Sequence, residues 1–170
     1  MLRPSLFLAL VALTSAAASA QPTGLRGTFV LNRSASADVN AAVERAVAPL
    51  NVVVRQIARP RLRRTNQPYG RIVLDWSPTE VSITTDARAA IRTSPVGTAI
   101  RWRRPEDGEW LNVSTVWQGD RLQQTFAAED GQRVNLYTLG PDGRTLTLDV
   151  TVTSPRLARP LTYRLVYAKQ

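Results

Sequence analysis

From Arg71 to the C-terminus, apolar and polar side chains alternate along the chain with a period of two. A β-strand points successive side chains to opposite faces, so this alternation predicts strands with one buried face and one solvated face. The segment 145–153 is the clearest case, and its apolar side is made of Leu146, Leu148, Val150 and Val152. Asp and Gly are adjacent at 119–120, 130–131 and 142–143. Glycine accepts the positive φ of tight hairpins, so this part of the chain predicts a run of antiparallel hairpins.

The number of these strands sets the fold class. Together with a first strand at 27–32, the alternating segments make roughly nine or ten strands. In the strand before the turn at 141–143, Val134, Leu136 and Thr138 form the expected apolar side. A long antiparallel meander buries its apolar face most simply by curling closed, which also removes exposed edges. The sequence favours a mainly β fold, an up-and-down meander closing into a barrel of about 8–10 strands. A two-sheet sandwich is the alternative.

A helical segment follows the first strand. Apolar residues recur there at the three- and four-residue spacing of one helix face, at Val39, Val43, Ala46, Leu50 and Ile57. Pro49 interrupts this stripe, because proline lacks the N–H that a helix interior uses. We expect a kinked helix or two short helices at 38–47 and 49–57, in an insert spanning about 38–58. Pro60 and Arg61–Arg64 are expected to lead out of the insert into a polar loop.

The first twenty residues have the pattern of a secretory signal peptide. Arg3 supplies positive charge, Leu6–Leu13 is an apolar run, and Ala18-Ser19-Ala20 has the A-x-A form of a cleavage site. The apolar run has only about eight residues, whereas a membrane-spanning helix needs roughly 20. We expect cleavage after Ala20, a single mature domain at 21–170, and a periplasmic or extracellular location.

The lack of cysteine and histidine narrows the chemistry available to this chain. A Ser-His or Cys-His nucleophile pair is excluded, and so is zinc binding through nitrogen or sulfur. The sequence contains no P-loop, dinucleotide fingerprint or serine-hydrolase motif. Asp75 and Asp149 remain as acids that could act as a pair, and the simpler expectation is that each faces solvent or an arginine. We therefore expect a protein that is not an enzyme and uses no cofactor or metal.

Positive charge is concentrated in one segment. The chain has a formal charge of +9, and five arginines lie within ten residues, at Arg55, Arg59, Arg61, Arg63 and Arg64. Three interpretations are open: a solvated surface whose arginines pair with acids, a docking site for an anionic surface, and a nucleic-acid site. Export argues against a nucleic-acid partner. The alternative function is therefore an envelope protein that docks on an anionic membrane surface or partner through this segment.

A barrel of this size can enclose one small molecule. The candidate residues to line such a cavity are aromatic or basic and lie in the strands: Trp76, Trp102, Arg133, Tyr137 and Tyr163. A plain aromatic core is the competing interpretation, because the sequence does not reveal which face of each strand points inward. The leading hypothesis is a monomeric, exported, non-enzymatic barrel that binds a small apolar or amphipathic ligand.

Several short motifs resemble those of known β-barrels. Gly27-Thr28-Phe29 stands where lipocalins carry Gly-x-Trp, and Arg164 matches the basic residue that those barrels place late in the chain. Residues 117–122 and 137–146 fit the pattern W-x-G-x-x-L followed by Y-x-L-x-x-D-G-x-T-L, which is similar to that of small secreted bacterial proteins. The strand order and turn rhythm resemble the lipocalin and fatty-acid-binding superfamily. The resemblance implies a lipocalin-like, calycin-type barrel over about 27–168.

Overall fold

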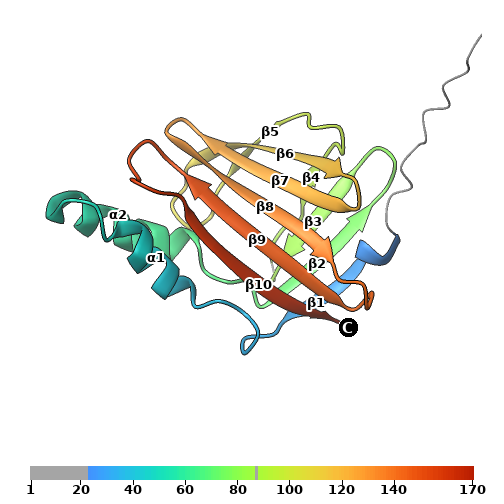
Figure 1. Ribbon diagram of the computed structural model, residues 1–170. Helices are drawn as coiled ribbons and strands as arrows, with labels where there is room; N and C mark the ends of the chain where they lie inside the picture. Colours follow the sequence, from blue (N-terminus) through green and yellow to red (C-terminus); the bar gives the residue numbers. More distant parts are fainter. Residues whose placement is uncertain (1–22, 87) are drawn as a thin grey trace, which may run out of the picture.

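A computed structural model describes residues 23–86 and 88–170 (Figure 1). The predicted signal peptide at 1–20 and the predicted mature start at Gln21 lie outside these residues. A short 3-10 helix, η1 (Thr23–Leu25), precedes the first strand. The strands are β1 (Gly27–Leu31), β2 (Arg71–Trp76), β3 (Val81–Thr85), β4 (Ile91–Thr93), β5 (Ile100–Arg103), β6 (Trp110–Gln118), β7 (Arg121–Ala128), β8 (Gly131–Leu139), β9 (Thr145–Thr153) and β10 (Leu161–Lys169). Two helices, α1 (Val39–Val47) and α2 (Val52–Thr65), lie between β1 and β2.

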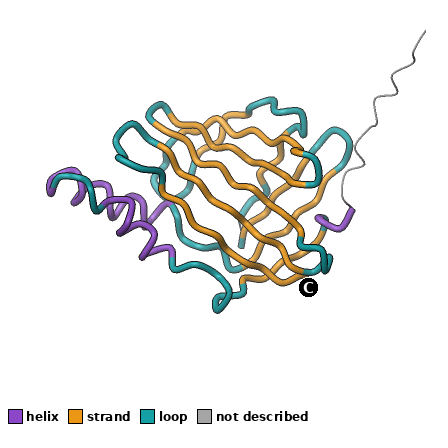
Figure 2. The backbone as a smooth tube through the Cα atoms, in the orientation of Figure 1, coloured by secondary structure: helices purple, strands orange, loops and turns teal. Residues whose placement is uncertain are grey.

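The ten strands form one antiparallel sheet in the order β4-β3-β2-β1-β10-β9-β8-β7-β6-β5. Strand β1 joins the two halves of the meander, because Phe29 is paired with Ile72 on β2 and with Lys169 on β10. The edge strands β4 and β5 are consecutive in the chain, and the segment between them bridges to β6 at Val96 and Val116. The sheet therefore curls into a nearly closed barrel (Figure 2), which confirms the barrel over the sandwich.

Helix α1 begins and packs as its sequence pattern predicts. The Asp38 side chain accepts a hydrogen bond from Ala41 N at 3.1 Å and so caps the first turn. The apolar stripe of α1 is buried through Val39, Ala42, Val43, Ala46 and Val47. Burial of this face fixes α1 against one end of the barrel, where it contacts β10 (Figure 1).

Helix α2 begins later and ends later than the sequence pattern suggests. Asn51 caps its start by accepting from Val54 N at 2.9 Å, and Pro49 lies in the turn between the helices. The expectation that the chain leaves the helix at Pro60 is wrong, because Pro60 lies inside α2. Contacts beyond the proline hold these last turns in place, because Asn66 at the end of the helix accepts a hydrogen bond from Tyr163 on β10. At its end, Asn66 Nδ2 donates to Leu62 O at 2.9 Å.

The inward faces of the strands follow the predicted alternation in most of the sheet, but β8 reverses it. Asn135 and Tyr137 are buried, whereas Val134 and Leu136 are partly exposed. Polar side chains occupy the inner face of β8 because they find partners inside the barrel. The hydroxyl of Tyr137, for example, donates to Gln124 Oε1 at 3.2 Å.

A layer of polar side chains crosses the barrel interior. Gln124 on β7 lies opposite Thr115 on β6 and Asn135 on β8, and Thr93 donates to Thr115 Oγ1 at 2.6 Å. All four side chains are no more than 3% exposed. The layer stands between a small apolar cluster around Phe126 and a larger one that fills the rest of the barrel. The buried core thus contains two apolar clusters and a group of buried polar side chains.

Candidate functional site

A cavity of about 490 Å³ lies at the end of the barrel that α2 covers, which we call the mouth. It opens to solvent between α2 and the ends of strands β6–β9. On the helix side its apolar lining is Leu50, Val54, Ile57, Ala58 and Leu62. On the barrel side it is Leu111, Phe126, Ala128, Val152 and Leu157. A concave, mostly apolar surface with a few polar groups is the usual form of a small-molecule site.

Arg133 is the charged side chain on the inner side of this cavity. Its Nε donates to Asn135 Oδ1 at 2.8 Å, and its Nη1 donates to the Thr65 carbonyl at the end of α2 at 3.1 Å. The guanidinium also lies 5.7 Å from the centre of the Tyr69 ring. Among the described residues no carboxylate pairs with Arg133. The mouth therefore holds a cation whose protein partners are neutral.

Beneath Arg133, hydrogen bonds run through the polar layer toward the opposite end of the barrel. Asn135 Nδ2 donates to the Tyr137 hydroxyl at 3.3 Å, and this hydroxyl donates to Gln124 Oε1. Gln124 Nε2 and the Tyr167 hydroxyl are buried without a hydrogen-bond partner in the described part of the chain. Burial raises the pKa of Tyr137, Tyr163 and Tyr167, so all three phenols remain neutral at physiological pH.

The C-terminal end of α2 is fixed to the barrel from inside. The Tyr163 hydroxyl on β10 donates to Asn66 Oδ1 at 3.2 Å, and Asn66 in turn caps α2 through Leu62 O. Arg133 holds the neighbouring Thr65 carbonyl. These contacts place the end of the helix directly over the inner part of the cavity.

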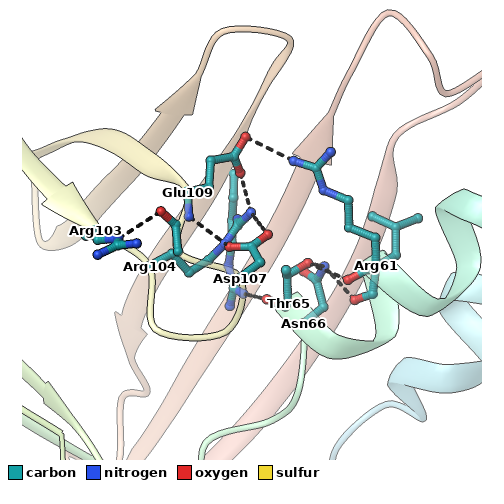
Figure 3. Close-up of polar contacts among 10 residues, drawn as sticks. Arg61, Thr65, Asn66, Arg103, Arg104, Asp107 and Glu109 are labelled. Atoms are coloured by element: carbon teal, nitrogen blue, oxygen red, sulfur yellow. Dashed lines mark hydrogen bonds and ion pairs between the residues drawn. The ribbon is translucent and has the colours of Figure 1, made fainter.

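A chain of ion pairs ties α2 to the β5–β6 turn across the rim of the mouth (Figure 3). Arg61 on α2 contacts Glu109 Oε1 at 3.0 Å, and the other oxygen of Glu109 contacts Arg104. Arg104 also donates to both carboxylate oxygens of Asp107, at 2.8 and 2.7 Å. The hydrogen bond from Arg104 lowers the pKa of Asp107, which keeps this carboxylate charged well into acidic solution. We call Arg61, Arg104, Asp107 and Glu109 the rim network.

The structure brings one of the five predicted ligand-binding residues to the cavity. Arg133 lines it, whereas Tyr137 and Tyr163 are buried in the hydrogen-bond arrangements described above. Trp102 packs edge-on against Phe126, and Phe126 itself lines the cavity. Trp76 lies away from the mouth, against Trp117 at 5.6 Å between ring centres. Whether any of the five residues contacts a ligand stays a prediction.

The five clustered arginines all lie on α2, and most have partners within the protein. Arg59 and Arg63 both contact Glu44 on α1, at 2.9 and 2.8 Å. Arg55 donates to the carbonyls of Ala48 and Leu50, both at 2.7 Å, and Arg61 belongs to the rim network. Arg64 is the member of the cluster that has no hydrogen bond or ion pair among the described residues. Three of the five arginines therefore pair with acids, and Glu44 serves two of them.

Apolar side chains are exposed on the same helix. Val52, Val53 and Ile57 are 65%, 69% and 67% exposed, and α2 as a whole buries no residue fully. Most helices of this length bury one apolar stripe against a core. Helix α2 instead presents apolar surface both to the cavity and to solvent. Within the described residues, no helix is long and apolar enough to cross a membrane.

The polar layer was not among the residues predicted for the site. A signal was present in the sequence, because Gln124 stands at an apolar-side position between Leu122 and Phe126, and Thr115 stands likewise in β6. The acids considered as a catalytic pair are elsewhere. Asp75 pairs with Arg26 at 2.9 Å, and Asp149 pairs with Arg164 at 2.7 Å. The described residues contain no group of acids that could hold a metal ion.

Comparison with known proteins identifies the fold. No protein-family model matches the sequence, and no curated protein matches it. Among solved structures, a Schistosoma mansoni fatty acid binding protein in complex with arachidonic acid is 16% identical, with a TM-score of 0.56 over 87% of this chain and 97% of that chain. Human cRBP IV is 15% identical, with a TM-score of 0.54 over 86% and 98%. The REP1-NXSQ fatty acid transporter is 11% identical, with a TM-score of 0.55 over 86% and 96%. These likenesses show a calycin-type barrel.

Proposed function

We propose that this protein is an exported, non-enzymatic barrel that binds one small apolar or amphipathic ligand in the cavity at its mouth. The observation that carries this proposal is the solvent-open cavity of about 490 Å³, with its apolar lining from α2 and from strands β6–β9. The barrel beyond Arg133 is filled by side chains such as Leu122, Tyr137 and Leu148, each 0% exposed. The ligand therefore lies under the helix and not in the centre of the barrel. Two of the structurally similar proteins, a fatty acid transporter and a fatty acid binding protein, support the proposal.

Binding of an uncharged fluorescent lipophile, Nile red, tests the proposal. Ala128 lines the cavity, so Ala128→Trp should fill it and weaken binding at least about tenfold, since the probe loses most of its enclosed surface. Ala168→Trp is the matched control, because Ala168 is exposed on β10 and does not line the cavity. It should leave binding unchanged. Equal binding by the wild type and Ala128→Trp, or no binding by the wild type, would contradict a ligand site at the mouth.

We also propose that the working protein is the mature chain from Gln21, located in the periplasm or outside the cell. Among the described residues the buried core begins at Leu25, which lies after the predicted cleavage site. The intact mass of the protein recovered from envelope and medium fractions of the producing cell should match residues 21–170. Ala18→Arg disrupts the A-x-A pattern and should leave the full-length mass. Full-length protein in the cytosolic fraction of the wild type would contradict export.

Docking on an anionic membrane surface is a second candidate function, favoured by the exposed Val52, Val53 and Ile57 beside the arginines of α2. Such a helix can lay its apolar side chains into the lipid interface while cations meet the headgroups. Val53→Asp should reduce retention on phosphatidylglycerol vesicles. Val96→Asp is the control, because Val96 is 77% exposed but lies away from α2. Unchanged retention in Val53→Asp would exclude docking through the helix.

A further inference from the structure

We propose that Arg133 binds the singly charged anionic head of an amphipathic ligand, whose apolar body extends outward from the barrel beneath α2. This inference rests on the proposed ligand-binding function and adds the chemical class and the direction of the ligand. Three features of the mouth carry it: a guanidinium without an acidic partner, acidic partners for the other arginines of the cavity, and open apolar-lined space on the outer side of Arg133 only.

The first feature is the unused hydrogen-bonding capacity of Arg133. A guanidinium carries five N–H donors, and two donate to the neutral acceptors Asn135 Oδ1 and Thr65 O. Arg133 is partly buried, and a cation shielded from water without a counter-charge is costly. A carboxylate matches the remaining donors in a two-point contact. An anionic ligand would supply the charge that the described chain does not provide.

The second feature limits the charge of the ligand. The other arginines that line the cavity are Arg61, Arg104 and Arg156. Arg61 and Arg104 belong to the rim network, and Arg156 contacts Asp130 at 3.0 Å. Arg133 is therefore the one lining arginine without an acidic partner in the described residues. A single spare positive charge fits a monoanion better than a dianion such as a phosphate monoester.

The third feature sets the direction of the ligand. On the inner side of Arg133, the space is occupied by Asn135 and Tyr137, which are 1% and 0% exposed. On the outer side, the cavity is bounded by the apolar face of α2, including Val54 and Ile57, and by Leu157 beyond β9. An apolar chain attached to a head at Arg133 can only be buried outward. This arrangement also gives a role to Ile57, an apolar residue of α2 that is 67% exposed.

Competition between matched amphiphiles tests the head-group site. The wild type should bind dodecanoate at least about tenfold more tightly than dodecan-1-ol, since a hydrogen bond to a charged group contributes more than one to a neutral group. Arg133→Met should weaken dodecanoate by about 10- to 100-fold and dodecan-1-ol by less than about twofold. Arg164→Met, which removes an arginine on β10 that pairs with Asp149 and does not line the cavity, should change neither. Dodecyl phosphate at pH 8 should bind no more tightly than dodecanoate.

The outcomes separate this inference from the proposed function. If the wild type binds both amphiphiles equally, or if Arg133→Met weakens both equally, Arg133 serves only to hold α2, and the cavity still binds ligands. If neither amphiphile nor Nile red binds, the proposed function itself fails. Tighter binding of dodecyl phosphate than of dodecanoate would overturn the inference that the site prefers a singly charged head. If Arg133→Met does not fold, the wild type alone tests the inference: tighter binding of dodecanoate than of dodecan-1-ol supports it, and equal binding overturns it.

Methyl NMR spectra of the wild type with dodecanoate test the direction. The methyl resonances of Val54, Ile57 and Leu157 should shift as the ligand is added, because these side chains line the outer cavity. Those of Leu122 and Leu148 should stay in place, because both are buried in the filled interior. Shifts confined to the interior methyls would show that the chain runs inward and would overturn the inference.

Discussion

The phenol of Tyr137 is the point at which hydrogen bonds from two strands meet inside the barrel. It donates to Gln124 Oε1 at 3.2 Å and accepts from Asn135 Nδ2 at 3.3 Å. Tyr167 is equally buried, but its hydroxyl has no partner among the described residues. The two buried phenols therefore contribute differently to the stability of the fold. A buried hydroxyl without a hydrogen bond lowers stability, whereas a hydrogen-bonded one does not.

Replacing each tyrosine by phenylalanine should reveal this difference. Tyr137→Phe leaves Gln124 Oε1 and Asn135 Nδ2 without their hydrogen-bond partner and should lower the free energy of unfolding by about 1–3 kcal/mol. Tyr167→Phe removes an unpartnered group and should leave the free energy unchanged or raise it. Urea denaturation of the two variants and the wild type measures both values. An equal loss in the two variants would contradict the hydrogen-bond arrangement in the interior.

Asp142 gives the protein a contribution to stability that depends on pH. Its carboxylate accepts hydrogen bonds from Thr145 Oγ1 at 2.6 Å and from the backbone N–H groups of Arg144 and Thr145. These bonds lower the pKa of Asp142 to about 2, from an ordinary value of 3.8. A lowered pKa means that the folded state binds this proton less readily than the unfolded state. The contribution is therefore complete above about pH 4 and is lost as the pH falls toward 2.

Asp142→Asn should reduce the loss of stability between about pH 4 and pH 2, because the amide cannot take up that proton. Above this range the variant should be less stable than the wild type, since the charged acceptor of the β8–β9 turn is gone. Urea denaturation at several pH values measures both effects. The same pH dependence in the variant and the wild type would show that the turn does not hold Asp142 charged.

At the scale of elements, the sequence predicts strands better than it predicts helix α2. The alternation of apolar and polar side chains is contained in the sequence of each strand, so it can be recognised without knowing the rest of the fold. Segments such as β9 (Thr145–Thr153) and the hairpins around it are therefore confirmed. The end of α2 was misplaced because Pro60 normally ends a helix, whereas here Asn66 and Tyr163 fix the turns beyond it. The inner face of β8 was misassigned for a related reason. Its polar residues are buried by partners on other elements, which no local pattern reports.

The rim network makes the position of α2 sensitive to one ion pair. Arg61→Gln removes the contact with Glu109, and exposed pairs of this kind contribute about 0.2–1 kcal/mol, so deuterium uptake across 52–65 should rise up to about fivefold. Arg64→Gln is the control, since Arg64 lies on the same helix without a partner in the described residues. Hydrogen exchange followed by mass spectrometry measures the difference. Equal uptake in the two variants would show that the network does not hold the helix.

The candidate site is assembled from distant parts of the sequence. Arg133 and the Thr65 carbonyl are 68 residues apart, and Tyr163 and Asn66 are 97 residues apart. The sequence identified Arg133 as a candidate, but it could not show that Trp76 lies away from the mouth or that α2 reaches over Arg133. Those facts depend on the closure of the barrel, and closure depends on strands paired across the full length of the chain.

Strand β1 is the element on which that closure depends. It has five residues, yet it is paired with β2 on one side and with β10 on the other, so it joins the first hairpins to the rest of the meander. Phe29, at its centre, is 0% exposed.

A chain that begins at Gln21 keeps this strand and should unfold cooperatively, with the same midpoint as full-length protein. A chain that begins at Asn32 lacks β1 and leaves two edges open, so it should lose the cooperative transition and aggregate. Circular dichroism on heating, with light scattering, distinguishes the two outcomes. A cooperative transition in the chain from Asn32 would show that the remaining nine strands close without β1, and that the central position of β1 in the sheet is not what holds the barrel together.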